Sequence, residues 1–140
     1  MSVEENKAIV RRHLIDVLEQ GHVELIGSIY APDGSTPDDW GTAENFKTAV
    51  IWHHKHCPGF KVNLLDLMAE EDRVMAYIQF DVTYSVEDTS PQMQPFGKPV
   101  SWRNVNIYRI ANGKIVSERW ISKFTDVMVE MGAYKLQKVA

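Results

Sequence analysis

The first part of the chain spaces its apolar residues as an amphipathic helix does. Starting at Val10 they recur at i, i+4, i+7 and i+8, which predicts a helix over residues 4–19 that ends at Gly21. Residues 23–30 continue the pattern as a short second helix. Pro32 and Gly34 then break the chain into a loop that extends to Gly41.

A third helix is predicted after this loop, with Thr42 as its N-cap and Pro58-Gly59 as its end. Its apolar stripe consists of Phe46, Val50, His53 and Cys57. The chain therefore begins with three helices.

From residue 61 the period changes from 3.6 to 2. Four segments rich in Val, Ile and aromatic residues follow, over residues 61–70, 73–85, 99–110 and 114–124, and each predicts a strand. Residues 86–97 read as a longer loop, and residues 124–132 close with a short helix. Helices followed by strands predict an α+β fold, a curved antiparallel sheet covered on one face by helices, in a single domain over residues 1–140.

Composition narrows the function classes. The chain has 140 residues and a net charge of −4, with no cluster of Lys and Arg, so binding to nucleic acid or to a membrane surface is not expected. A polar start and a single cysteine, Cys57, favour the cytoplasm. On one helical turn His53 could pair with His56 or Cys57, but no third ligand is spaced to complete a zinc site, so no metal is predicted.

Three segments carry a family resemblance: AEEDRVMAYIQFDVTY, PFGKPVSWRNVNIYRIANGKIVSERW and the closing VMVEMG. Together with the helical opening that ends in Tyr30-Ala31-Pro32-Asp33, they resemble the SnoaL-like polyketide cyclases of the nuclear-transport-factor-two-like superfamily. The resemblance implies a cone-shaped α+β barrel that encloses one apolar pocket and forms a homodimer through its sheet. It also implies acid/base catalysis without metal or organic cofactor.

The last hairpin indicates which side chains face that pocket. With Ala111-Asn112-Gly113 as a three-residue turn, Ile110 lies opposite Lys114 and Asn106 lies opposite Glu118. Resemblance to the ketosteroid isomerase branch places Asn106 at an oxyanion-stabilising position and so selects its face as the pocket face. Ile115 and the cations Arg103, Arg109, Arg119 and Lys123 then fall on the outer face.

Four residues are predicted to carry the chemistry. Glu118 lies on the pocket face with no obvious cation beside it, which suits a general acid or base, although a bond to Asn106 would give it a structural role. Asp38 matches the spacing of the proton-abstracting carboxylate in the isomerase branch, but it also suits a helix N-terminus. His53 could move a proton, or it is simply a core histidine. Asn106 would steady an oxyanion or hold Glu118 in an amide network.

The remaining pocket residues are predicted to bind the substrate, mainly as an aromatic wall that suits a hydrophobic polycyclic ligand. They are Trp40, Phe46, Ile78, Phe80, Tyr84, Trp102, Asn104, Trp120 and Ser122. One departure from the family is Lys123, which stands where SnoaL-like cyclases commonly carry an Asp, so the acid/base set differs from the family pattern.

The resemblance thus implies a small enzyme of polyketide or terpenoid metabolism that cyclises or isomerises its substrate by proton transfer. Two other functions use the same residues. One is a binding or assembly module without catalysis, and the other is hydration of a double bond or epoxide. The sequence names neither the substrate nor the role of the 86–97 loop.

Overall fold

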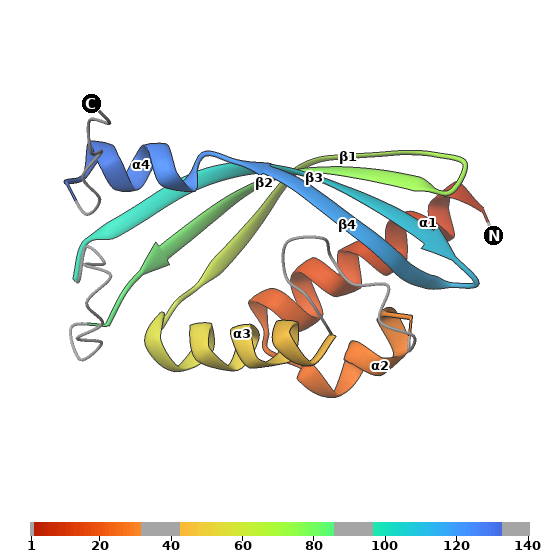
Figure 1. Cartoon of the computed structure of the whole chain (residues 1–140), viewed down its shortest axis with the longest axis horizontal. Helices are drawn as coiled ribbons and strands as arrows, with labels where there is room; N and C mark the ends of the chain where they lie inside the picture. Colours follow the sequence, from red (N-terminus) through yellow and green to blue (C-terminus); the bar gives the residue numbers. More distant parts are fainter. Residues whose placement is uncertain (1, 32–42, 86–96, 133–140) are drawn as a thin grey trace, which may run out of the picture.

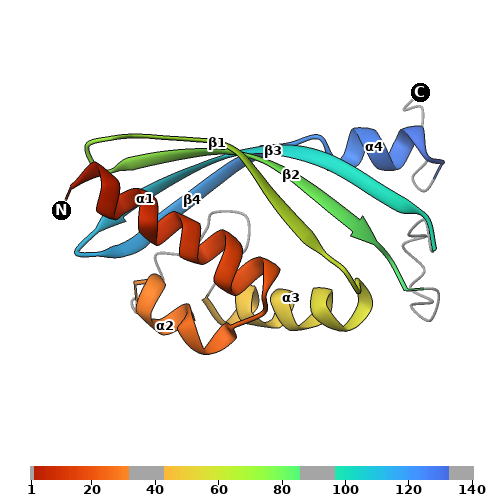
Figure 2. The ribbon, with the colours of Figure 1, turned by 180° about the vertical axis from the view of Figure 1, so that it is seen from behind.

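The computed structural model describes residues 2–31, 43–85 and 97–132. Four strands form one antiparallel sheet in the order β1-β2-β3-β4, with β1 at Lys61–Glu70, β2 at Arg73–Thr83, β3 at Pro99–Ala111 and β4 at Lys114–Ser122. The sheet curves along its length, and α1, α2 and α3 lie together on its inner face (Figures 1 and 2). This arrangement confirms the α+β class and the curved antiparallel sheet predicted from the sequence.

The N-terminal helix changes type along its length. The segment α1 (Val3–Arg11) begins at a capping box in which the Ser2 hydroxyl accepts from the Glu5 amide and the Glu5 carboxylate accepts in return. It continues without a break into a π-helix, η1 (Arg12–Glu19). The predicted single helix over 4–19 is therefore correct in extent, but its second half has the wider π geometry, which the apolar spacing did not indicate.

The remaining helices are short or end at sequence-encoded breaks. A 3-10 turn, η2 (Val23–Leu25), leads into α2 (Ile26–Ile29), and Tyr30 then forms a parallel bridge with Ile115 of β4. The helix α3 (Ala43–His56) stops before Pro58-Gly59, as predicted. The last helix, α4 (Phe124–Glu130), extends beyond the end of β4 (Figure 1).

Alternation along the strands separates the core from the outer face. In β2 the inward residues Val74, Ala76, Ile78, Phe80 and Val82 are buried, whereas Tyr77 between them is exposed. The inward residues pack against Val10, Leu14, Val17, Ile29 and Val50 from the helices. The helices α1, α2 and α3 lie on the inner side of the sheet, and α4 lies at one end of it, beyond β4 (Figures 1 and 2).

The β3–β4 hairpin differs from the predicted one. Its turn has two residues, because Asn112 and Gly113 adopt φ of 51° and 74° and Ala111 pairs with Lys114. A bulge follows between Arg109 and Ile110, after which Tyr108 pairs with Glu118.

The predicted register was therefore wrong, with two consequences. In most of the hairpin the register differs from the predicted one by two residues, so the cross-strand partner of Asn106 is Trp120 instead of Glu118. A shift of two residues leaves every side chain on its predicted side of the sheet. Near the turn the face changes: Ile115 is fully buried opposite Ile110 and does not lie on the outer face.

Candidate active site

A cavity of about 350 Å³ lies between the inner face of the sheet and the helices. Its volume falls in the range of small-molecule sites. Its walls come from η1, α3, β2, β3, β4 and α4. The lining residues are His13, Leu18, Phe46, His53, Phe60, Phe80, Tyr84, Trp102, Asn104, Asn106, Glu118, Trp120, Ser122, Phe124 and Thr125.

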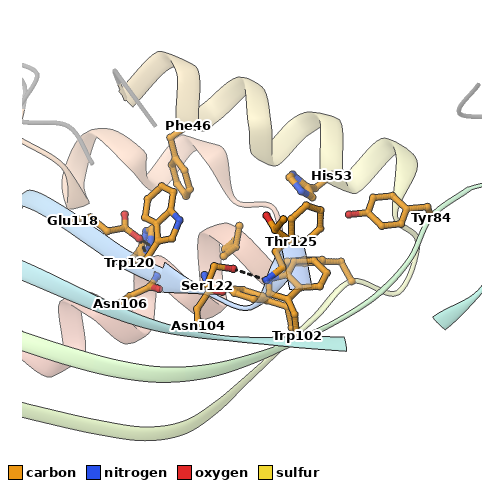
Figure 3. Close-up of a pocket in the computed structure, with 15 residues that line it drawn as sticks. Phe46, His53, Tyr84, Trp102, Asn104, Asn106, Glu118, Trp120, Ser122 and Thr125 are labelled. Atoms are coloured by element: carbon orange, nitrogen blue, oxygen red, sulfur yellow. Dashed lines mark hydrogen bonds and ion pairs between the residues drawn. The ribbon is translucent and has the colours of Figure 1, made fainter. Parts of the chain in front are cut away.

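The two ends of this cavity differ in character. Glu118 and Asn106 lie at one end with Phe46 and Trp120, while His53, Tyr84 and Trp102 lie at the other (Figure 3). Asn104 and Ser122, which pair across β3 and β4, lie between the two ends. We call the first region the polar end and the second the aromatic end.

Glu118 is the centre of the polar end. Its side chain is buried, and Oε1 accepts a hydrogen bond of 3.1 Å from Asn106 Nδ2 while Oε2 accepts one of 3.5 Å from the Tyr30 hydroxyl. His13 Nε2 lies 3.6 Å from Oε1. From the sequence Glu118 had no obvious cation beside it; the structure brings the His13 imidazole of η1 to it.

Two tyrosines complete this polar end. Burial, reinforced by the negative charge of Glu118, raises the pKa of Tyr30 well above its ordinary value, and the same causes raise the pKa of Tyr108. Both phenols therefore stay protonated at neutral pH. Each can donate to the carboxylate, so neutral dipoles surround the buried charge.

Asn106 is held within this network. Its Nδ2 donates to Glu118 and also, at 3.0 Å, to the Tyr108 hydroxyl, so both of its N–H groups are engaged. The contact between Asn106 and Glu118 weighed from the sequence is thus present. The Oδ1 atoms of Asn106 and Asn104 are buried with no hydrogen-bond partner among the described residues.

The aromatic end is a row of rings in mutual contact. Phe60 stacks on Phe80 at 5.8 Å between centroids, Phe80 contacts Trp102 at 5.5 Å, and Phe124 meets Trp102 edge-on at 4.8 Å. Offset and edge-on geometries of this kind are the favourable ones for aromatic pairs. They give this end an apolar wall suited to a flat ring.

His53 is the polar group of the aromatic end. Its Nδ1 donates to the Ala49 carbonyl at 2.7 Å, so the lone pair of the neutral ring is on Nε2. Burial lowers the pKa of His53 below its ordinary value of about 6.5. The ring is therefore neutral at pH 7, and Nε2 can accept a hydrogen bond or a proton.

The structure brings together most of the residues predicted for the pocket. Among the predicted catalytic residues, Glu118, His53 and Asn106 line the cavity, and so do Phe46, Phe80, Tyr84, Trp102, Asn104, Trp120 and Ser122. Ile78 does not: it faces inward but is packed in the core with no exposed surface. Asp38 and Trp40 lie outside the described residues.

Lys123 also stays away from the cavity, since its exposed ammonium group pairs with Asp126 at 3.3 Å. The residues that sequence reasoning missed are His13, Leu18, Phe60, Phe124 and Thr125. For His13 a signal was available, because it lies three residues after Val10 and four before Val17 on the buried stripe.

The described residues form neither a metal site nor a membrane-spanning helix. Within them, no three His, Cys, Asp or Glu side chains gather closely enough to hold a metal ion. None of the helices in this part of the chain has both the length and the apolar character required to cross a bilayer.

Comparison with known proteins gives a family and a fold. The family model described as SnoaL-like polyketide cyclase matches residues 8–130. No curated protein is significantly similar to the chain in sequence.

Solved structures resemble the chain along nearly its whole length. AclR from Streptomyces galilaeus is 24% identical, with a TM-score of 0.76 over 98% of this chain and 91% of that one. TsrD from Streptomyces laurentii is 14% identical, with a TM-score of 0.77 over 96% of this chain and 99% of that one. A SnoaL-like polyketide cyclase from Agrobacterium tumefaciens is 15% identical, with a TM-score of 0.72 over 94% and 100%. At these identities the similarity establishes the fold.

Proposed function

Since the chain belongs to the SnoaL-like polyketide cyclase family, we propose that it is a cofactor-independent enzyme that cyclises or isomerises a hydrophobic polycyclic substrate by acid/base catalysis. Membership of the family supports a cyclase-type role. The choice of substrate and the proton-transfer chemistry are the proposal, and they rest on the cavity.

One observation carries the proposal: a buried carboxylate stands at one end of a mostly apolar cavity, among neutral hydrogen-bond donors. Charged side chains are rarely buried without a paired charge or a function. In a water-excluding cavity a carboxylate can take a proton from the activated carbon next to a carbonyl group, because the surrounding dipoles are fixed before the reaction begins.

Each cavity residue has a role in this proposal. Glu118 takes up and returns the proton, and Asn106 positions it through the 3.1 Å hydrogen bond. At the aromatic end, Nε2 of His53 accepts a hydrogen bond or proton from the far side of the substrate. Trp102 and Phe80 hold the substrate rings by stacking. Asp38 stays a proposed second carboxylate.

A different class of function, a ligand-binding module, is favoured by one feature of the same site. The oxygens of Glu118 are already engaged by Asn106 and Tyr30, as expected of a carboxylate that only stabilises the fold. Hydration of a double bond or epoxide would use the same cavity. Measured turnover distinguishes these functions, since a binding module retains its ligand unchanged and a hydratase adds the mass of water.

The experiment is a screen of polycyclic ketones and epoxides with product analysis by mass spectrometry. Glu118→Gln keeps an acceptor for Asn106 but cannot take up a proton, so we expect turnover to fall by about a thousandfold with the fold intact. Glu70→Gln, an exposed change on β1, is the matched control and keeps full activity. Unchanged turnover in Glu118→Gln refutes the assignment.

We also propose that two copies of the chain associate through the outer face of the sheet. Met68, Met75 and Ile107 form one row across β1, β2 and β3, and Tyr77 and Ile121 belong to the next row. Of these, Met68, Tyr77, Ile107 and Ile121 are exposed, Ile121 by 76%. Apolar rows on a sheet face that the described helices leave uncovered support an interface between copies.

A further inference from the structure

His13 is buried at the polar end more completely than Glu118 or Asn106. Only 1% of its surface is exposed, against 2% for Glu118 and 4% for Asn106. Its ring meets Tyr30 and Tyr108 edge-on at 5.4 and 5.3 Å between centroids and tilts against Phe46 at 5.1 Å. Packing on three sides fixes the orientation of the imidazole ring.

The π geometry of η1 places this ring. His13 and Leu18 are five residues apart and both line the cavity. An α-helix would turn them about 140° away from each other, whereas a π-helix brings residues five apart onto the same side. The wider helix is secured at its end, where His54 Nε2 donates to the Leu18 carbonyl at 2.9 Å and the Glu19 carboxylate accepts from the Val62 amide.

Tyr30 fixes which nitrogen of His13 faces the carboxylate. Its hydroxyl lies 2.6 Å from Nδ1, while Nε2 lies 3.6 Å from Glu118 Oε1. The single hydroxyl proton of Tyr30 is donated to Glu118 Oε2, so Nδ1 carries the ring proton and donates it to the hydroxyl oxygen, which leaves the lone pair of the neutral ring on Nε2. The phenol therefore holds the imidazole with Nε2 directed at Glu118.

Among the described residues, the groups at this end leave one route for a proton. In the described part of the chain, the contacts recorded for Glu118 or His13, besides the one between them, come from Tyr30 in the segment after α2, Asn106 and Tyr108 in β3, and Phe46 in α3. Of these the phenols stay protonated and the amide and phenyl groups do not titrate. Among the described residues, His13 is thus the contact of Glu118 that can accept its proton.

We propose that His13 and Glu118 share one exchangeable proton, with Glu118 meeting the substrate and His13 acting as the positioning residue that stores and returns the proton. The inference rests on the proposed function for the reaction that uses this proton. The substrate C–H bond breaks, its electron pair stays on the substrate as an enolate, and the proton moves to Glu118 and then to His13 Nε2. Ring closure or isomerisation takes one proton back from the pair, so none is consumed, and a proton held by the pair can exchange with solvent before it returns.

The transfer needs only a small movement. A charge-assisted hydrogen bond between nitrogen and oxygen is about 2.8 Å long, so the 3.6 Å gap between Nε2 and Oε1 closes by less than an ångström. Proton exchange within the pair also leaves the net charge of the cavity unchanged. That matters because a new uncompensated charge in an apolar cavity is costly.

The test follows the pair directly by NMR on the intact protein. The Glu118 carboxyl carbon and the His13 ring nitrogens are observed as the pH is changed, with His13→Gln used to identify the ring signals. We expect both groups to report one common titration step, because strongly interacting sites titrate as a pair. In Glu118→Gln the His13 signals no longer follow that common step. Independent steps, or a His13 step unaffected by Glu118→Gln, overturn the proposal.

Two further variants keep the result clear. His22→Gln, which changes an exposed histidine outside the cavity, leaves the common step in place. Tyr30→Phe shifts that step without splitting it, since it removes the hydroxyl contacts to Nδ1 and to Glu118 Oε2 but leaves His13 and Glu118 themselves in place. If His13→Gln fails to fold, the ring signals are assigned through bonds in the wild-type protein and the same outcomes decide.

An activity measurement separates the pair from the proposed function. The probe is the bicyclic ketone 2-tetralone, whose acidic C–H protons exchange in D₂O when a base removes them. In His13→Gln we expect the limb of the kcat–pH profile that belongs to the common step to disappear with KM unchanged. An unchanged profile overturns the role of His13. Absence of exchange by wild type contradicts the proposed function, while the NMR titration still decides whether the pair exists.

Discussion

Replacing Asn106 by Asp would put a second carboxylate beside Glu118. The substituted atom lies 3.1 Å from Glu118 Oε1, and two negative charges at that distance repel by about 5 kcal/mol at an effective dielectric constant of 20. In the folded protein the two carboxyl groups, at positions 106 and 118, therefore keep one proton between them. In the unfolded chain both groups release their protons above pH about 4. This repulsion corresponds to a pKa rise of about 4 units for one member of the pair.

The sign of the pH dependence follows from proton uptake. A carboxyl group whose pKa is raised on folding contributes stability at low pH and loses it as the pH rises through the raised value. The free energy of unfolding of Asn106→Asp, measured with urea at pH 5, 6 and 7, should fall by about 1.4 kcal/mol per pH unit relative to wild type.

The matched control is Asn63→Asp on the outer face. Asn63 Nδ2 donates to Asp81 Oδ2 at 2.6 Å, so the geometry is similar, but both residues are partly exposed. Hydrogen bonds, that of Ser101 foremost, lower the pKa of Asp81 there. With water nearby the repulsion is only about 1 to 2 kcal/mol. If Asn106→Asp shows the same pH slope as wild type, the polar end is not a dry site around Glu118.

Three further predictions concern other parts of the fold. Both Gly21 and Gly59 have positive φ, so replacing either by Ala costs about 1 to 2 kcal/mol of backbone strain. Gly21→Ala should lower the free energy of unfolding in urea more than Gly59→Ala, because only at Gly21 would the new Cβ lie 3.2 Å from the His54 ring. Equal losses would contradict that packing. Because burial lowers the pKa of His53, the free energy of unfolding of wild type should fall as the pH drops below about 6.5. His53→Gln should flatten this pH dependence. An identical dependence in the variant would count against a buried neutral ring. Wild type should sediment at twice the chain mass of 16.0 kDa and Ile121→Lys at 16.0 kDa, whereas a wild-type mass of 16.0 kDa would refute the sheet interface.

The facing of the strand residues could be predicted from the sequence because it depends only on alternation. Asn104, Asn106 and Glu118 reached the cavity although the predicted register was wrong, since a shift of two residues preserves every face. The bulge was not visible in the sequence, and it changed the outcome only near the turn, where Ile115 is buried. Alternation shows which side of the sheet a residue is on, but not whether its side chain reaches the cavity or is packed beneath it. For that reason Ile78 was assigned to the pocket, although it lies in the core.

The polar end could not be assembled from local patterns. Its members come from η1, the segment after α2, and β3 and β4, and the bridge from Tyr30 to Ile115 joins residues 85 positions apart. The buried stripe marked His13 as facing inward, but a π-helix has the same apolar residues as an α-helix, so nothing in the sequence placed His13 beside Glu118. Chemical type alone left His13 indistinguishable from an ordinary core histidine.

Deuterium exchange into 2-tetralone tests the central claim most directly, because it requires only that the cavity bind a polycyclic ketone and remove a proton from carbon. The rate is followed by NMR in D₂O for wild type, Glu118→Gln and Glu70→Gln. The account predicts exchange catalysed by wild type and Glu70→Gln and lost by a factor of about a thousand in Glu118→Gln. Equal exchange rates in wild type and Glu118→Gln would contradict it.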